Sequence, residues 1–303
     1  MMNLKFIVVN IFLAISCAVL SNAQELPALS YFMNNRVLYN PAAAGTNETQ
    51  FTASLAVRPG WAGTSGLLWA EYKFIPYNMA AAISVFQDRI GANVNTNFMA
   101  NYAYHLYLTK RSKLSLGLSA GAVSFSFGDG EITNVWDEGD QSYLKAIYAT
   151  TLPKFGFGVQ YYNKQFFASL SIPDIVMVGT ALYQRLNEGN FFQRKRNYVA
   201  MAGYNFKISD KYVLNPNVLF LYHPISGAKV DANLQVKLLD YFWIGATYST
   251  SGNHNLMAGT QLSSRMRFGY AYIFINTNAT SVLSTHEVNL VLFLDNLFQP
   301  KQN

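Results

Sequence analysis

The chain has 303 residues, of which 51% are hydrophobic, 15% aromatic and 13% charged, and its formal net charge at pH 7 is +6. The charged share is about half of the roughly 25% that is usual for soluble domains, which argues against an ordinary soluble protein. The basic residues are scattered apart from the QRKR cluster at 193–196. We interpret that cluster as a solvated loop that can touch lipid phosphates, and we expect no nucleic-acid partner.

The first 23 residues have the pattern of a secretory signal peptide, with cleavage expected after Ala23. A basic residue, Lys5, precedes an apolar run that ends near residue 20. The alternative is a lipoprotein anchored at Cys17, which we disfavour because apolar sequence continues past this cysteine. Removal of residues 1–23 leaves no cysteine, which excludes disulfides and thiolate metal sites.

The rest of the chain divides into an N-terminal periplasmic lead-in at 24–49 and an outer-membrane barrel at 50–303. About fourteen segments of the second part alternate apolar and polar side chains, which is the period of a β-strand. These segments lie near 50–58, 66–74, 78–87, 93–108, 113–125, 153–161, 165–172, 197–208, 211–222, 228–238, 241–250, 254–262, 265–274 and 286–294. An even number of long antiparallel strands is typical of a bacterial transmembrane β-barrel.

Two of these segments show which side chains we expect in the interior. Residues 93–108, NVNTNFMANYAYHLYL, and residues 228–238 place apolar or aromatic side chains on one face and polar ones on the other. The alternative is a large soluble sandwich with one wet face, which would not need such dense tyrosine and phenylalanine. The expected lumen-lining residues are Asn95, Asn97, Asn101, His105, Lys229, Asp231, Asn233, Gln235 and Lys237.

The connections between the segments alternate in length. Those after even-numbered strands are short, and the long ones, near 126–152 and 173–196, follow odd-numbered strands. A barrel with periplasmic termini has short periplasmic turns and long outer loops in this order. The sequence therefore predicts a multi-pass barrel in the cell outer membrane, in contact with its lipid.

The sequence predicts no enzyme, no metal site and no cofactor. Its four histidines lie far apart, and the acidic residues of the loop at 129–140 lack the spacing of a calcium loop. His286 and Glu287 are neighbours in a strand and so face opposite sides, which prevents them from acting on one substrate atom. An outer-membrane hydrolase that uses the loop acids is the third and least favoured hypothesis.

Several short motifs resemble those of one family. The segment Tyr39-Asn40-Pro41-Ala42, with Gly45 after it, is followed beyond the first strand by RPGWAGTSG, which contains Arg58, Trp61 and Gly63. Near the C-terminus stand MRFGYAYIF, with Tyr270 and Tyr272, and THEVNLVLFL, with His286 and Glu287. Together these blocks resemble the PorP/SprF family, outer-membrane proteins of the type IX secretion and gliding machinery of Bacteroidetes, over nearly the whole mature chain.

The resemblance implies a barrel without catalytic activity that supports export or surface anchoring of secreted proteins or adhesins and links to periplasmic secretion components. It also implies that the motif residues contact partners or support structure. The chain departs from the family pattern at Pro59 and Gly60, where members often carry glutamines, and at Ile273, where they often carry aspartate. These departures leave open whether it is a core component or a paralogue dedicated to one cargo. A passive porin-like channel for small solutes is the alternative function.

Two motif positions have a local physical interpretation. Pro41 has a fixed φ and restricts Asn40 to extended geometry, so together they favour a fixed turn that holds the N-terminal segment under or inside the barrel. The alternative is an ordinary lead-in to the first strand. Trp61 is expected in the first outer loop or folded inward, with membership of the interfacial aromatic belt as the alternative.

Overall fold

The structure, a computed structural model, describes residues 29–60, 63–127, 148–176, 196–224, 227–239, 241–276 and 282–295. The signal peptide, Trp61, the acidic residues of the loop at 129–140 and most of the QRKR cluster lie outside these ranges. No helix in the described ranges is long and apolar enough to span a membrane.

The described residues form fifteen strand segments. They are β1 (Phe51–Gly60), β2 (Gly63–Phe74), β3 (Met79–Ile90), β4 (Asn93–Tyr107), β5 (Ser112–Phe127), β6 (Tyr148–Asn163), β7 (Phe166–Val176), β8 (Tyr198–Tyr204), β9 (Phe206–Lys207), β10 (Tyr212–His223), β11 (Gly227–Leu238), β12 (Phe242–Ser249), β13 (Asn253–Ser263), β14 (Met266–Asn276) and β15 (Val282–Leu294). Three short 3-10 helices accompany them: η1 (Arg36–Leu38), η2 (Pro41–Ala43) and η3 (Ile75–Tyr77).

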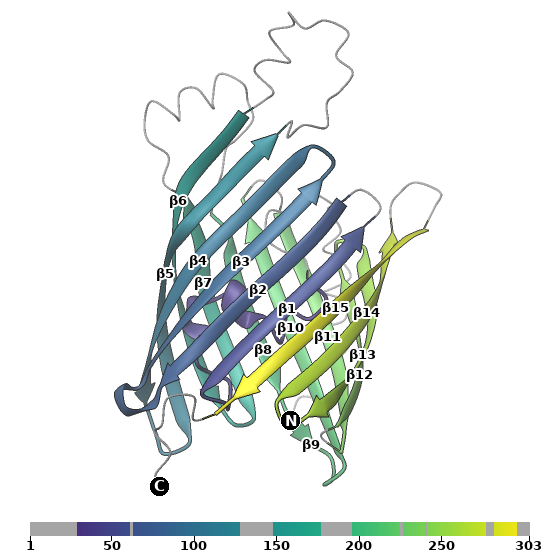
Figure 1. Cartoon of the computed structure of the whole chain (residues 1–303). Helices are drawn as coiled ribbons and strands as arrows, with labels where there is room; N and C mark the ends of the chain where they lie inside the picture. Colours follow the sequence, from purple (N-terminus) through teal and green to yellow (C-terminus); the bar gives the residue numbers. More distant parts are fainter. Residues whose placement is uncertain are drawn as a thin grey trace, which may run out of the picture.

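All the strand segments belong to one antiparallel sheet that closes on itself (Figure 1). Consecutive strands pair along the chain, and β15 pairs with β1, from Phe51 opposite Leu294 to Val57 opposite Val288. Both β8 and β9 pair with β10, so they are two parts of one interrupted strand and the wall has fourteen positions. The predicted fourteen-strand antiparallel barrel is confirmed. Closure leaves no unpaired sheet edge, as a strand protein in lipid requires.

The interruption between β8 and β9 has a cause in the neighbouring strand. Pro216 lies inside β10, where it pairs with Leu234 of β11 but has no N–H to donate toward the other side. Ladder pairing with β10 is interrupted at Tyr204 and Asn205, which lie opposite Pro216 and Asn215. The side chain of Asn215 donates there to the carbonyl of Tyr204 at 3.3 Å, which replaces part of the lost ladder.

The wall is one residue thick, so side chains alternate between outer surface and interior. The outward row is apolar and exposed, and includes Leu55, Leu68, Ile83, Phe98, Leu118, Phe157, Leu170, Leu234, Ile244 and Leu256. The inward row is buried and rich in small and polar side chains, among them Ser54, Ser84, Asn101, Ser115, Ser119, Gln160, Ser171, Asn217, Asn233 and Asn289. Because exposed apolar residues surround a polar interior, the barrel is suited to a lipid environment.

Short turns join the strands at one end of the barrel. They follow β2, β4, β6, β9, β11 and β13, and the connection after β2 contains η3. The longer connections, including 128–147 and 177–195, start from the opposite end and fall outside the described ranges.

Candidate functional site

A segment that precedes β1 lies inside the barrel. Residues 29–49, here called the plug, contain η1 and η2, which Figure 1 shows within the ring of strands. Its hydrophobic residues Tyr31, Phe32, Val37 and Tyr39 are buried. Residues 29–45 of the segment predicted as a periplasmic lead-in therefore occupy the interior, and Glu48 is exposed where the segment approaches β1. This is the inner of the two placements that Asn40 and Pro41 left open.

The first part of the plug is attached to the last strands of the wall. The backbone N–H of Ser30 donates to the carboxylate of Glu287 on β15 at 2.9 Å. The Tyr31 hydroxyl donates to the carbonyls of Tyr270 and Ala258 at 2.6 and 3.0 Å. Its ring lies so close to Gly269 that a Cβ there would come within 2.9 Å of it. A glycine in the wall thus makes room for the ring.

Asn35 connects the plug to the first two strands. Its side-chain oxygen accepts from the Trp69 indole N–H at 2.7 Å and from the Ser54 hydroxyl at 3.3 Å, and its amide donates to the carbonyl of Tyr31. All these groups are buried. A buried donor such as the indole N–H needs a partner, and the plug supplies it.

Asn40 and Pro41 fix the turn at η2. The side-chain oxygen of Asn40 accepts from the N–H of Ala42 at 2.8 Å, which is a helix N-cap, and Pro41 occupies the first helical position. The Asn40 amide donates to the carbonyls of Val159 and Leu170 on β6 and β7 at 3.1 and 3.4 Å. The predicted fixed turn is therefore also a link to the wall.

Two glycines of the wall hold η2 closely. Gly117 of β5 and Gly158 of β6 are register partners, and a Cβ on Gly117 would lie 2.1 Å from the backbone nitrogen of Ala42. A Cβ on Gly158 would lie 2.0 Å from the side-chain oxygen of Asn40. A side chain at Gly117 would overlap the backbone of the plug, and a side chain at Gly158 would overlap the side chain of Asn40, so both positions require glycine.

The last part of the plug is bound by a second wall carboxylate. Glu71 of β2 accepts from the N–H of Gly45 at 2.8 Å and from the Asn47 amide at 2.7 Å. Gly45 has a φ of +70°, a conformation that favours glycine, and a Cβ there would overlap Ala80. Carboxylates of β2 and β15 therefore hold backbone N–H groups near the two ends of the described plug.

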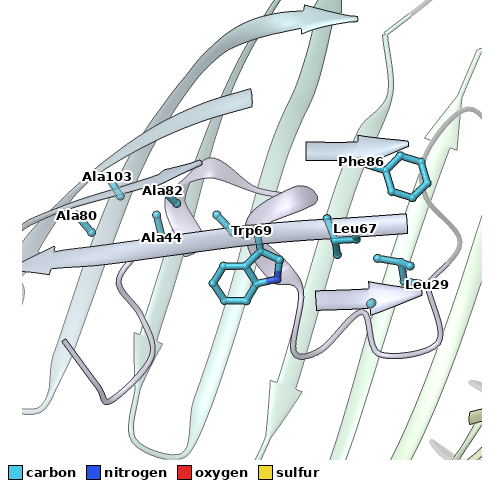
Figure 2. Packing of buried hydrophobic residues seen from close by; sticks show 10 residues of the cluster. Leu29, Ala44, Leu67, Trp69, Ala80, Ala82, Phe86 and Ala103 are labelled. Carbon is cyan, nitrogen blue, oxygen red and sulfur yellow. The ribbon is translucent and has the colours of Figure 1, made fainter. Parts of the chain in front are cut away.

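Apolar side chains pack on two sides of the plug. Figure 2 shows one cluster, in which Leu29 and Ala44 of the plug meet Leu67, Trp69 and Phe86 of β2 and β3. The second cluster joins the plug to β8, β10, β13 and β14, and it consists of Tyr31, Phe32, Met33, Tyr39, Val199, Met201, Leu219, Met257 and Ala271. Together with the polar contacts, these clusters place the plug against most of the wall.

Burial also sets the protonation of the plug. It raises the pKa of the Tyr31 and Tyr39 phenols well above the ordinary value, so both stay neutral and the Tyr31 hydroxyl remains a donor. It lowers the pKa of Arg36, whose guanidinium lies 4.5 Å from the centre of the Phe167 ring and donates to the Thr46 hydroxyl.

The other motif residues lie apart from the plug or on the outside. Tyr270, Tyr272 and His286 belong to the outer face, where the Tyr270 hydroxyl is hydrogen-bonded to Nδ1 of His286. Arg58 is partly buried near the end of β1, where it donates to Ser65. Gly63 begins β2 so close to the carbonyl of Arg89 that a Cβ would overlap it. These residues form no single cluster.

The predicted inner-face residues all occupy the inward row. Asn101, His105, Asp231, Asn233 and Gln235 are buried, and Asn95, Asn97, Lys229 and Lys237 are partly buried. Several bind one another or the wall: Lys154 donates to Asn97 at 3.1 Å, and Lys229 pairs with Asp231 at 2.9 Å. Over the described ranges, no group of three histidine, cysteine, aspartate or glutamate side chains is placed to hold a metal ion.

Sequence reasoning missed Asn35, Glu71 and Ser171 as residues that bind the plug. Glu71 had a usable signal, because it is the single acidic residue of the strand GLLWAEYKF and falls on its inward face. Ser171 donates to the carbonyl of Tyr39 at 2.6 Å across a separation of 132 residues, and no local pattern marks it.

The family model for type IX secretion system membrane proteins PorP/SprF matches residues 21–292. The chain belongs to the PorP/SprF family. Its fold and family are those of a membrane-barrel secretion component and not of a known enzyme class, and it is a multi-pass β-barrel of the outer membrane. Among curated proteins no sequence match is found.

Solved structures with similar folds are outer-membrane barrels. Omp33 of Acinetobacter baumannii aligns with a TM-score of 0.51 and 10% identity over 81% of this chain and 98% of its own. The toluene transporter TbuX of Ralstonia pickettii aligns with a TM-score of 0.51 and 8% identity over 85% of this chain and 93% of its own. At such low identity these similarities show the fold alone.

Proposed function

We propose that this PorP/SprF barrel acts without catalysis in the type IX secretion system, where it supports export or surface anchoring of secreted proteins or adhesins and links them to periplasmic components. The observation that supports this best is the attachment of the plug to wall strands on several sides of the interior. A barrel whose interior holds a fixed part of its own chain is suited to be a scaffold rather than a conduit for another polypeptide.

The wall contacts support a fixed plug. Its hydrogen bonds reach β15, β14, β13, β2, β6 and β7, and both carboxylates that accept from its backbone are buried. Hydrogen bonds to charged groups contribute about 1.5–3 kcal/mol each, and leaving such a group buried and unpaired costs more. Movement of the plug out of the barrel would break several of these bonds together.

A passive channel for small solutes is the second candidate. The polar inward row favours it, and TbuX, which has a similar fold, is a toluene transporter. The plug weighs against it, because the segment packs apolar side chains on two sides of the interior. Conductance in planar bilayers distinguishes the two candidates: a scaffold gives no steady single-channel current, and a porin does.

The scaffold function is tested by mass spectrometry of proteins that co-purify with the tagged full-length barrel after mild detergent extraction from its own outer membrane. We expect enrichment of a large secreted surface protein or of periplasmic secretion components. Asn40→Ala, which disturbs the plug, and Trp61→Ala should reduce that enrichment. Gly66→Ala is the matched control, because a Cβ at this wall glycine has no neighbour within 4 Å. Recovery of the barrel with lipid alone would contradict the proposal.

A further inference from the structure

The end of the barrel that carries the short turns has a group of exposed cations. They follow β4, β6, β9 and β13, and we call them the basic rim: Lys110, Arg111, Lys164, Lys211 and Arg265. Within the described part of the chain, none of the five forms an ion pair. In the described part of the chain, three exposed acids lie at the same end: Glu48, Asp210 and Asp295. Asp210 pairs with Lys207 at 2.7 Å, and Asp295 accepts from the N–H of Gln50. The five cations of the rim therefore face two further acids, Glu48 and Asp295, and the described part of this end has a net positive charge.

Exposed apolar residues come just before the cations of the rim. Leu108, Ile208 and Leu262 continue the outward rows of β4, β9 and β13, and they are 54%, 65% and 58% exposed. A cation follows each of them after two or three residues: Lys110, Lys211 and Arg265. The turns after β2 and β11 have no cation among their described residues and instead expose Ile75, Tyr77, Leu239 and Tyr241.

The spacing matches the edge of a bilayer. The cations lie in tight turns, where the N–H groups of Leu108 and Ile208 donate to the carbonyls of Ser112 and Tyr212. They therefore stand just beyond the apolar residues and reach further outward through their long side chains. The head-group layer on each side of the hydrocarbon core is about 5–8 Å thick. When the apolar residues lie in the acyl region, they are removed from water and the cations reach the depth of the lipid phosphates. A protein partner in the aqueous periplasm would explain the cations, but it would leave a ring of apolar residues in water.

The long outer connections carry charges of both signs. Residues 128–147 contain five acidic residues and one lysine, and residues 177–196 contain four basic residues and one glutamate. The described short turns at the other end carry the basic rim, which attracts anionic lipids. This placement agrees with short turns on the periplasmic side, where the leaflet is made of phospholipid.

We propose that the basic rim binds the phosphate groups of anionic phospholipids in the periplasmic leaflet and so fixes the depth of the barrel. Arg111 and Arg265 suit this role because a guanidinium binds two phosphate oxygens at once. Lys110, Lys164 and Lys211 add positive charge around the rim. This site is separate from the plug, and its test does not depend on the secretion function.

The experiment uses native mass spectrometry of the purified full-length barrel, delipidated in non-ionic detergent and titrated with phosphatidylglycerol or phosphatidylcholine. The test variant carries Lys110→Gln, Arg111→Gln, Lys211→Gln and Arg265→Gln. The control exchanges the same positions as Lys110→Arg, Arg111→Lys, Lys211→Arg and Arg265→Lys, which keeps the charge. We expect the glutamine variant to bind phosphatidylglycerol at least tenfold more weakly, the control to bind like the wild type, and phosphatidylcholine binding to be unchanged.

Equal phosphatidylglycerol binding by the glutamine variant and the wild type would overturn the proposal. An equal loss of binding to both lipids would also overturn it. An unchanged lipid affinity combined with loss of a periplasmic protein from co-purification would overturn it too, and would assign the rim to a protein partner. Heat-modified mobility on a denaturing gel verifies that each barrel is folded. If the fourfold variant does not fold, the single changes Arg111→Gln and Arg265→Gln are compared with the charge-keeping changes Arg111→Lys and Arg265→Lys, and the same outcomes decide.

Discussion

The contact between Gly117 and η2 allows a direct test of the plug. Replacing Gly117 by alanine adds one methyl group, whose carbon would lie 2.1, 2.4 and 2.5 Å from backbone atoms of Pro41 and Ala42. Ordinary contacts between such atoms are about 3.5–4.0 Å, so η2 or the wall must move by more than 1 Å. The atoms in the way belong to backbone, and no rotamer change relieves the overlap.

The cost can be estimated from packing energetics. Overpacking of a well-packed interior costs about 1–3 kcal/mol. Movement of η2 also strains the hydrogen bonds of Asn40 to β6 and β7, each with a net value of about 0.5–1.5 kcal/mol. The packing cost alone shifts the ratio of docked to undocked plug by a factor of about 5 to 150, since 1.4 kcal/mol corresponds to a factor of ten.

The docked fraction is measured by limited proteolysis of residues 29–49 in the folded barrel, and channel opening by conductance in planar bilayers. Gly117→Ala should increase both cleavage of the plug and the frequency of current steps, whereas Gly66→Ala should change neither. The double change Gly117→Ala with Gly158→Ala should cost less than the sum of the single changes, because the two glycines are register partners. If Gly117→Ala behaves like the wild type in both assays, the close packing of η2 in the barrel is refuted.

Two other predictions concern the polar contacts of the plug. Glu71→Ala leaves the buried N–H of Gly45 and the partly buried Asn47 amide without their acceptor, so the free energy of unfolding measured in urea should fall by about 2–4 kcal/mol. Glu71→Gln keeps one acceptor oxygen and should lose less, and equal losses would show that the hydrogen bonds do not matter. Burial raises the pKa of Tyr31 and Tyr39. The contribution of the two neutral phenols to the free energy of unfolding is therefore complete below the unfolded pKa of about 10, and it is lost as the pH rises toward the folded pKa. The melting temperature should therefore fall above pH about 10, and Tyr31→Phe with Tyr39→Phe should make that fall shallower; an unchanged slope would contradict the assignment.

Much of the wall could be predicted from local sequence, because each strand must present an apolar face to lipid and a different face to the interior. Residues 93–108 illustrate this: the alternation of tyrosine and asparagine gives both the strand and its two faces. The pattern did not give the interruption at Asn205. Its cause, Pro216, lies on the neighbouring strand, and the pairing of the two strands is not a local property.

The plug was harder to predict for the same reason. Asn40 and Pro41 indicate a turn, but a local pattern does not show what surrounds it. The contacts that place the plug join residues far apart in the chain: Ser30 and Glu287 are separated by 257 residues, and Asn40 and Leu170 by 130. The polar inward residues predicted an interior in which their hydrogen bonds are satisfied. The sequence alone does not show whether water or protein satisfies them.

The composition of the plug explains why it folds against the wall and not by itself. Its two 3-10 helices have three residues each, so most of their backbone groups have no partner within the helix. The wall provides partners for several backbone groups of the plug: Glu287 for the N–H of Ser30, Ser171 for the carbonyl of Tyr39, and Glu71 for the N–H of Gly45. Short helices of this kind are unstable in water without tertiary contacts. A plug released from the barrel would therefore lose its structure, and this favours a fixed part of the scaffold over a domain that moves in and out as a folded unit.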